Sequence, residues 1–330
     1  MRSMKRLKKL ALSILSVMIL CGCSTVKTKA AYTVYPIGYI IERLSGGTVE
    51  AVSIQEDTMV QRAQIRENYQ DILADSAMLF YIGQLEPYMQ VYANEINEAA
   101  DAKTDLSILN AVYDFKRYTP VIAGNDLTFV EGPYYKDPAF DLVDTDVKDL
   151  YLWIDPIAML SMSKDILSWM KTQYPDNAAV FDANMEKLET DLINLDAQYQ
   201  ALATKIINEH RSVKFVTMTA GFGNWQKTYG FEVYPVVLSK YGVLPDEEQL
   251  KVIRQRILED DVRYIVYEPN MPADMVALFN ELEDGLGLTR VEMSNLSSLT
   301  DADKAAGKDY LSIMYENLAV LETMSRNRTE

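Results

Sequence analysis

Apolar residues recur at spacings of three and four between about Asn177 and Glu209. They fall on one face of a helix of about nine turns that contains no Gly or Pro. At a rise of 1.5 Å per residue this helix would span roughly 50 Å, which is more than the width of a small domain. The pattern therefore predicts a rigid helix that joins two lobes, and half of a coiled coil is the alternative. The apolar positions are Phe181, Met185, Leu188, Leu192, Leu195, Tyr199, Leu202 and Ile206.

Short apolar runs alternate with helical segments on both sides of this predicted helix. Such alternation is typical of βαβ units and indicates an α/β fold with two lobes. We expect each lobe to hold a mainly parallel sheet flanked by helices, with a ligand-binding cleft between the lobes. The predicted strands are 33–36, 49–54, 78–82, 213–218 and 263–267, and the predicted helices are 37–44, 69–74, 157–170, 224–229, 245–258, 272–282 and 309–323.

The first 22 residues have the pattern of a secretory leader. Residues 1–9 are basic, and residues 10–20 form an apolar run that is too short to cross a membrane. The sequence Leu20-Cys21-Gly22-Cys23 resembles a bacterial lipobox, which implies lipidation of Cys23 and attachment to the outer face of the cell membrane. An ordinary signal peptide with incidental cysteines is the alternative. We therefore expect a signal peptide at 1–22, a tether at 23–31, a first lobe at 32–175, a linking helix at 176–210 and a second lobe at 211–330.

Charge and residue counts limit the partners and the kinds of metal site that the chain could have. The formal net charge is −16, and the leader carries five basic residues and no acid, so the chain without its leader is more acidic still. Such a surface repels nucleic acid, which we exclude as a partner. The two cysteines, Cys21 and Cys23, lie at the end of the leader, and the rest of the chain has none, so it has no internal disulfide or thiolate site. The single histidine, His210, rules out a site with several imidazole ligands and is expected to cap the end of the long helix.

Several segments, in this order and at this spacing, resemble the receptors for zinc and manganese of ABC importers. The match runs from about Thr33 to the last helix. It implies an extracytoplasmic solute-binding protein, acting as a monomer with a membrane permease and an ATPase, whose cargo would be Zn²⁺ or Mn²⁺. The segments are YIGQLEPYM at 81–89, LYLWIDP at 150–156, FVTMTAGFGNWQKTYG at 215–230, PDEEQLKVI at 245–253, YIVYEP at 264–269 and DYLSIMYENLAVL at 309–321.

In that family three histidines and one carboxylate meet in the cleft. The resemblance places the four positions at Gln61, Tyr151, Thr219 and Ser294, none of which carries the family's ligand type. Zinc and manganese sites are built from imidazole, thiolate and carboxylate groups, so we expect a degenerate metal site. The cargo could be a metal held in an unusual way or another solute.

Other residues near the expected cleft have two interpretations each. Asp155 and Glu268 could supply carboxylates to a cation, or they could be scaffold, which is the role that the resemblance implies. Trp153 and Trp225 could stack on a flat ligand or pack in the core. The acids Glu56, Asp57 and Glu67, and the run Asp137, Asp141, Asp144, Asp146 and Asp149, could attract a hard cation or remain solvated.

Three classes of function follow. The first is a receptor that delivers a solute to a permease. The second is a surface lipoprotein that kept the scaffold and binds a non-metal ligand or a protein partner. The third, an enzyme, is disfavoured because the sequence contains no nucleophile–base arrangement, nucleotide loop or HExxH motif.

Overall fold

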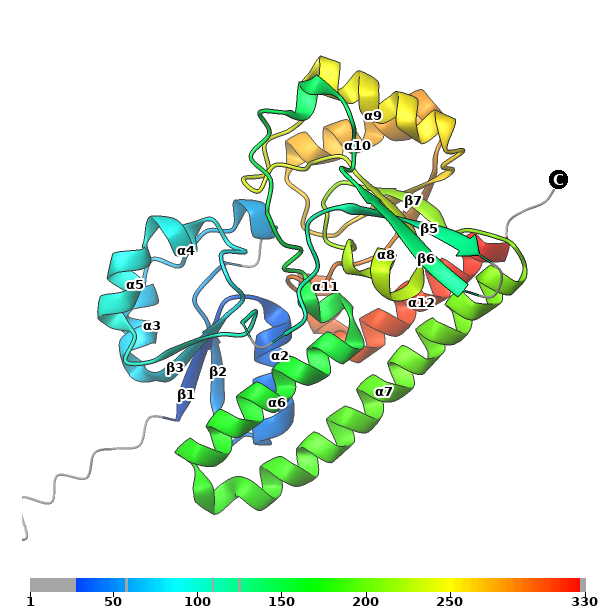
Figure 1. Ribbon diagram of the computed structural model, residues 1–330. Helices are drawn as coiled ribbons and strands as arrows, with labels where there is room; N and C mark the ends of the chain where they lie inside the picture. Colours follow the sequence, from blue (N-terminus) through cyan, green and yellow to red (C-terminus); the bar gives the residue numbers. More distant parts are fainter. Residues whose placement is uncertain (1–27, 57–58, 109, 124–125, 327–330) are drawn as a thin grey trace, which may run out of the picture.

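A computed structural model describes residues 28–56, 59–108, 110–123 and 126–326 of the chain. It shows two α/β lobes, each built on a four-stranded parallel sheet (Figure 1). The predicted fold class is therefore confirmed. The leader and Cys23 lie outside the described residues, as does Asp57.

The first lobe has the strand order β2-β1-β3-β4. Its strands are β1 (Lys29–Tyr32), β2 (Glu50–Ser53), β3 (Ser76–Tyr81) and β4 (Lys103–Asp105), and its helices are α2 (Tyr35–Ser45), α3 (Tyr69–Asp75), α4 (Tyr88–Val91) and α5 (Ala93–Ala99). Residues 29–31 were predicted to be tether, but they lie in β1, the strand that pairs with both β2 and β3. That prediction was wrong because Ala30 and Ala31 are small, apolar and fully buried, as a central strand requires.

The second lobe has the strand order β10-β9-β7-β8. Helix α9 begins with a capping box between Asp246 and Gln249, which satisfies backbone N–H groups at its first turn. The strands are β7 (Lys214–Thr217), β8 (Glu232–Pro235), β9 (Tyr264–Tyr267) and β10 (Thr289–Glu292). The helices are α8 (Asn224–Tyr229), α9 (Glu247–Glu259), α10 (Ala273–Leu286), α11 (Asp301–Ala305) and α12 (Tyr310–Arg326).

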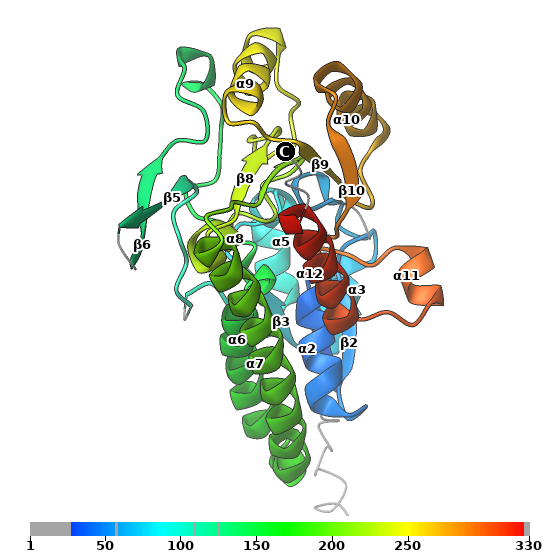
Figure 2. The same ribbon diagram turned by 90° about the vertical axis from the view of Figure 1, so that its right-hand side faces the viewer.

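The long helix α7 (Ala178–Asn208) buries all eight of the predicted apolar positions. It packs against α6 (Pro156–Gln173), α2 and α12, so its apolar face is covered within the chain rather than by a coiled-coil partner (Figures 1 and 2). The Tyr199 hydroxyl donates to the Met314 carbonyl at 2.7 Å and fixes α7 to α12. One continuous apolar cluster extends along these helices and includes residues of both lobes. His210, with a left-handed φ of 52°, ends α7 in an exposed position.

An antiparallel hairpin of β5 (Arg117–Ala123) and β6 (Asp126–Gly132) was not predicted. It lies beside β8 of the second lobe (Figure 2). Arg117 donates to Glu232 at 3.3 Å and to Asp260 at 2.9 Å, and the Tyr135 hydroxyl donates to the Pro235 carbonyl at 2.9 Å. The segment 114–149 therefore packs on the second lobe, although the predicted boundary assigned it to the first.

Candidate functional site

The expected site positions follow the carboxyl ends of strands, where α/β folds bind ligands. Gln61 lies in a 3₁₀ turn (Val60–Arg62) that follows β2, and Tyr151 immediately precedes another 3₁₀ turn (Leu152–Ile154). Thr219 follows β7, and Glu268 directly follows β9. The two lobes thus present these residues from both sides of the cleft.

Thr219 and Glu268 belong to a buried hydrogen-bond network. The Thr219 amide donates to Glu268 Oε1 at 2.8 Å, and the Thr219 hydroxyl donates to Glu268 Oε2 at 2.6 Å. Asn295 Nδ2 donates to the same Oε2 at 2.9 Å. Burial raises the pKa of Glu268, and these hydrogen bonds oppose the rise. Both carboxylate oxygens already have protein partners, so the contacts support the scaffold interpretation of Glu268.

Tyr151 lies beside this network. Gly221 has no side chain, and a Cβ there would lie 2.9 Å from Asn295 Cβ and 3.1 Å from Tyr151 Cε1, so both residues meet at this glycine. The Tyr151 amide donates to Asp149 Oδ1 at 3.2 Å. Its hydroxyl is buried, and no described residue forms a hydrogen bond with it. Tyr151, Thr219 and Asn295 are therefore close neighbours.

Gln61 lines a small cavity together with Tyr151, Asp149 and Ala220. The cavity has a volume of about 10 Å³, roughly the space of one water molecule. The Gln61 side-chain oxygen is buried and has no hydrogen-bond partner among the described residues. The cavity is therefore small, and residues of both lobes line it.

Ser294 does not face the cleft. Its backbone N–H and carbonyl pair with the side chain of Asn317 at 3.0 and 2.8 Å, and it lines a separate surface pocket. The neighbouring Asn295 contacts Thr219 and Glu268 instead. Ser294 and Asn295 thus have different surroundings, and the loop after β10 contains the left-handed residue Leu296, whose φ is +61°.

The two tryptophans and Asp155 are structural in their contacts. Trp153 Nε1 donates to the Asn295 carbonyl at 2.7 Å, and Trp225 Nε1 donates to the Ile154 carbonyl at 2.8 Å. Both tryptophans are fully buried, which leaves them no surface on which a ligand could stack. Asp155 caps α6 through the Ile157 amide at 2.8 Å and accepts from the Thr228 hydroxyl at 2.9 Å. These contacts hold the 150–156 segment against the second lobe.

Sequence reasoning missed Glu86, which follows β3. Its side chain is fully buried, and neither carboxylate oxygen has a hydrogen-bond partner among the described residues. Burial raises its pKa to about 7, and the nearby Thr33 hydroxyl opposes the rise. A single acid within the apolar run after a predicted strand was the signal that could have revealed it.

The remaining acids do not assemble into a metal-binding cluster. Glu56 and Glu67 are exposed, Asp137 caps a short 3₁₀ turn, and Asp144 pairs with Lys240 at 3.0 Å. Burial raises the pKa of Asp146 to about 6 and that of Asp149 to about 7. In the described part of the chain, no group of three or more His, Cys, Asp and Glu side chains has the spacing needed to hold a metal ion.

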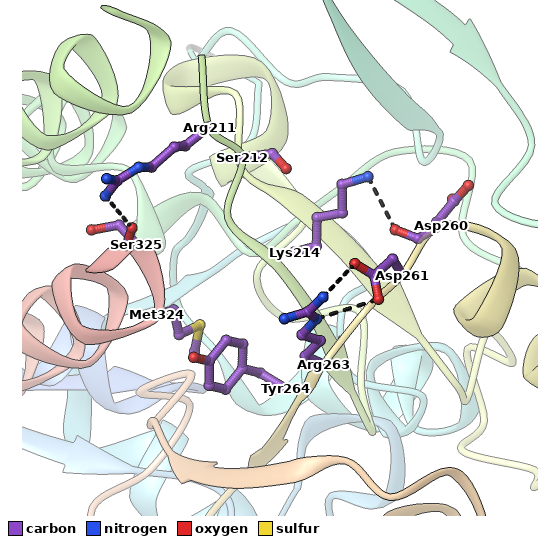
Figure 3. A pocket seen from close by; sticks show the side chains of 9 residues that line it. All are labelled: Arg211, Ser212, Lys214, Asp260, Asp261, Arg263, Tyr264, Met324 and Ser325. Atoms are coloured by element: carbon purple, nitrogen blue, oxygen red, sulfur yellow. Dashed lines mark hydrogen bonds and ion pairs between the residues drawn. The ribbon is translucent and has the colours of Figure 1, made fainter. Parts of the chain in front are cut away.

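A second polar pocket lies at the opposite, amino-terminal ends of β7 and β9 (Figure 3). It contains three cations, each of which has a protein partner. Arg211 donates to the Ser325 carbonyl at 3.0 Å, Lys214 donates to the Asp260 carbonyl at 3.2 Å, and Arg263 pairs with Asp261 at 3.0 Å. We therefore assign no ligand to this pocket.

The family model for the zinc-uptake complex component A, periplasmic, matches residues 31–324. The chain belongs to this family. Its members are solute-binding proteins of zinc-type ABC uptake systems and not enzymes, so the predicted family is confirmed.

Two named relatives illustrate the sequence similarity. The zinc-binding lipoprotein AdcA of Streptococcus pneumoniae is 28% identical over 178 residues, which cover 53% of this chain and 33% of AdcA. The high-affinity zinc uptake system protein ZnuA of Paracoccus denitrificans is 24% identical over 143 residues, covering 42% of this chain and 43% of ZnuA. The matched region is thus about a third of the length of AdcA.

Solved structures share the fold at lower sequence identity. A laminin-binding adhesin of Streptococcus agalactiae superimposes with a TM-score of 0.70 at 17% identity, covering 90% of this chain and 99% of the adhesin. The periplasmic zinc-binding protein TroA of Treponema pallidum has a TM-score of 0.69 at 15% identity, with coverages of 91% and 99%. Across the described residues, no helix has the length and apolar character needed to cross a membrane.

Proposed function

We propose that this chain is the extracytoplasmic solute-binding lipoprotein of a metal-type ABC importer with a degenerate metal site. Membership of the zinc-uptake family over residues 31–324 is the observation that carries the proposal. The leader pattern supports a lipid anchor at Cys23 on the outer face of the membrane, and a relative is itself named a lipoprotein. A permease and an ATPase would be its partners, and the receptor would act as a monomer.

The cleft chemistry distinguishes this receptor from one that chelates zinc through imidazoles. Tyr151 and Thr219 occupy positions where the family has histidines, and the only histidine of the chain ends α7. Neutral hydroxyl and amide oxygens bind Zn²⁺ poorly in comparison with imidazole and thiolate. We therefore propose a divalent cation as cargo, held without nitrogen or sulfur ligands.

The importer role is tested with the full chain in native membranes of its source organism. Chemical cross-linking followed by mass spectrometry should recover a permease and an ATPase with the wild-type protein. The Cys23→Ala variant should leave the membrane fraction and lose these cross-links. Recovery of an unrelated surface protein or polymer in place of a permease would favour the second candidate, a surface lipoprotein that kept only the scaffold.

A further inference from the structure

The hairpin of β5 and β6 has two outer edges with different surroundings. Its seven residue pairs follow one another without a bulge. Strand β5 contacts α8 and β8, whereas β6 packs chiefly against β5 and lies on the outside of the hairpin (Figure 2). In the described part of the chain, no strand pairs with the outer edge of β6. This edge is therefore available to another extended chain.

The register identifies the backbone groups of each strand that point away from its partner. Residue pairs in an antiparallel ladder alternate between pairs that exchange two hydrogen bonds and pairs that exchange none. Pro120 has no N–H, so its pair with Phe129 is of the second kind. The Tyr118 N–H donates to Gln226 Oε1 at 3.4 Å, and so it also points away from β6. By this alternation, the outer edge of β6 presents the N–H and C=O groups of Leu127, Phe129 and Glu131.

The outer edge of β5 is protected against pairing with another strand, and that of β6 is not. Pro120 removes an N–H from the β5 edge, and Gln226 accepts the N–H of Tyr118. Sheets protect open edges with proline, lysine or a bulge, because a row of unpaired N–H and C=O groups binds further strands. The β6 sequence DLTFVEG contains no proline or lysine. The contrast between the two edges of one hairpin indicates that β6 is a binding surface.

The two faces of the hairpin beside this edge differ in side-chain chemistry. One face carries the β-branched residues Val121 and Val130, which are 42% and 61% exposed. Val130 also lines a groove of about 380 Å³ between the hairpin and α9. On the other face, Lys227 of α8 pairs with Glu131 at 3.1 Å. Side chains alternate along a strand, so every second residue of an added strand would lie beside Val130 and the groove.

We propose that β6 binds an extended, basic segment of a partner protein, which adds a third strand to the hairpin. Main-chain hydrogen bonds to the outer groups of β6 supply the affinity, and β-branched side chains of the segment pack beside Val130. The formal net charge of −16 attracts a basic segment and repels a second copy of this chain. The surface lies on the hairpin and not in the cleft, so this inference goes beyond the proposed function and does not depend on the cargo.

Titration of the full chain with a synthetic strand tests this surface. The probe is the acetylated and amidated peptide KTVTVTVK, and hydrogen exchange with mass spectrometry locates its binding. We expect one peptide per chain and at least about fivefold slower exchange in segment 126–132. Two further peptides carry N-methyl groups on one or the other set of alternate residues. One of these two should bind at least about tenfold more weakly, because only one set of N–H groups faces β6.

Phe129→Pro and Phe129→Ala separate the backbone of β6 from its side chains. Both variants remove the ring, but only proline removes the outward N–H, and the hydrogen bonds to β5 do not use that group. Phe129→Ala should bind KTVTVTVK within about threefold of the wild type, and Phe129→Pro at least about tenfold more weakly. Should Phe129→Pro fail to fold, the methylated peptides make the same test on the wild-type chain.

Three results would overturn the proposal. The first is no binding of KTVTVTVK by the wild type, or protection from exchange outside segment 126–132. The second is equal binding of the methylated and unmethylated peptides. The third is slow exchange of segment 126–132 that appears without peptide as the protein concentration rises, because a second copy of the chain would then occupy the edge.

Discussion

Arg62 Nη1 donates to both carboxylate oxygens of Asp274, each at 2.8 Å, and so joins the first lobe to the second across the cleft. The same guanidinium group donates to the Gly242 carbonyl at 2.6 and 3.0 Å through Nη2 and Nε. Arg62 is adjacent to Gln61, so this contact holds the loop of an expected site position against the opposite lobe. One guanidinium group thus contacts a carboxylate through Nη1 and a backbone carbonyl through Nε and Nη2, and hydrogen bonds from a charged donor are stronger than neutral ones.

Replacing Arg62 with Ala should loosen the cleft with little change in global stability. The Asp274 side chain is 49% exposed, and exposed ion pairs contribute about 0–1 kcal/mol to the free energy of unfolding. Hydrogen exchange should become faster in segments 59–66 and 239–243. Arg254→Ala, which removes an arginine–carboxylate pair between Arg254 and Glu281 within the second lobe, is the matched control. Equal exchange in the two variants would show that Arg62 does not hold the lobes together.

Gly242→Ala should disturb the same contact from the other lobe. Gly242 has a φ of +65°, and an added Cβ would lie 2.9 Å from Arg62 Cγ. Gly287 has a similar φ of +63° with open space around it, so Gly287→Ala isolates the backbone strain, which is of order 1–3 kcal/mol. We expect faster exchange at segment 59–66 in Gly242→Ala only. Gly242→Ala should lower the free energy of unfolding by more than Gly287→Ala does. Adding Arg62→Ala should remove this extra loss, which chemical denaturation of the double variant will measure.

Thr219→Val should destabilise the protein by about 1–3 kcal/mol, because Glu268 Oε2 loses its shortest hydrogen bond while remaining buried. Val preserves the shape of the side chain, so the loss reports the hydroxyl. Thr323→Val removes an exposed hydroxyl that donates to the Ala319 carbonyl and should cost far less. Urea denaturation of both variants measures the difference. Similar costs would mean that the buried network contributes no more than a surface contact.

Asp146→Asn should change how stability depends on pH. Burial raises the pKa of Asp146 to about 6 from an ordinary value of 3.8, and Lys240 opposes the rise. The folded chain thus binds this proton more tightly than the unfolded chain, and the resulting stability is present below about pH 4 and lost as pH rises through 6. We expect Asp146→Asn to gain about 1–2 kcal/mol relative to the wild type between pH 4 and 7. Asp141→Asn, a change at an exposed neighbour, is the control variant.

Restoring the family's ligand types should create a zinc site. Gln61→His, Tyr151→His, Thr219→His and Asn295→Asp together place three imidazoles and one carboxylate in the cleft, which is a suitable Zn²⁺ ligand set. Calorimetry should show Zn²⁺ affinity at least 100-fold above that of the wild type. The same three histidines combined with Ser294→Asp should gain less, because the Ser294 backbone is bound to Asn317, away from the cleft.

The sequence predicted most accurately those elements in which apolar residues recur at regular spacing over many turns. The stripe from Phe181 to Ile206 fixed α7 almost to the residue because one buried face spans the entire helix. Loop positions were harder, since no periodicity sets which side chain faces inward: Ser294 lines a separate pocket, whereas Asn295 contacts Thr219. The hairpin of β5 and β6 was missed although a Gly-Asn turn signal lies between its strands in the sequence. The burial of Glu86 depends on how several strands end together, which local sequence does not reveal.

The apolar cluster that α7, α6, α2 and α12 share between the lobes limits how cargo can enter and leave. A hinge motion that separated the two sheets would expose this cluster to water, at a cost of about 25 cal/mol for each Å² of apolar surface. The short Val60–Arg62 turn contacts the other lobe through the Arg62 guanidinium group, and Val60 itself is buried in the shared cluster. Separation of the lobes is therefore costly, and any opening of the cleft would also have to break the Arg62–Asp274 pair.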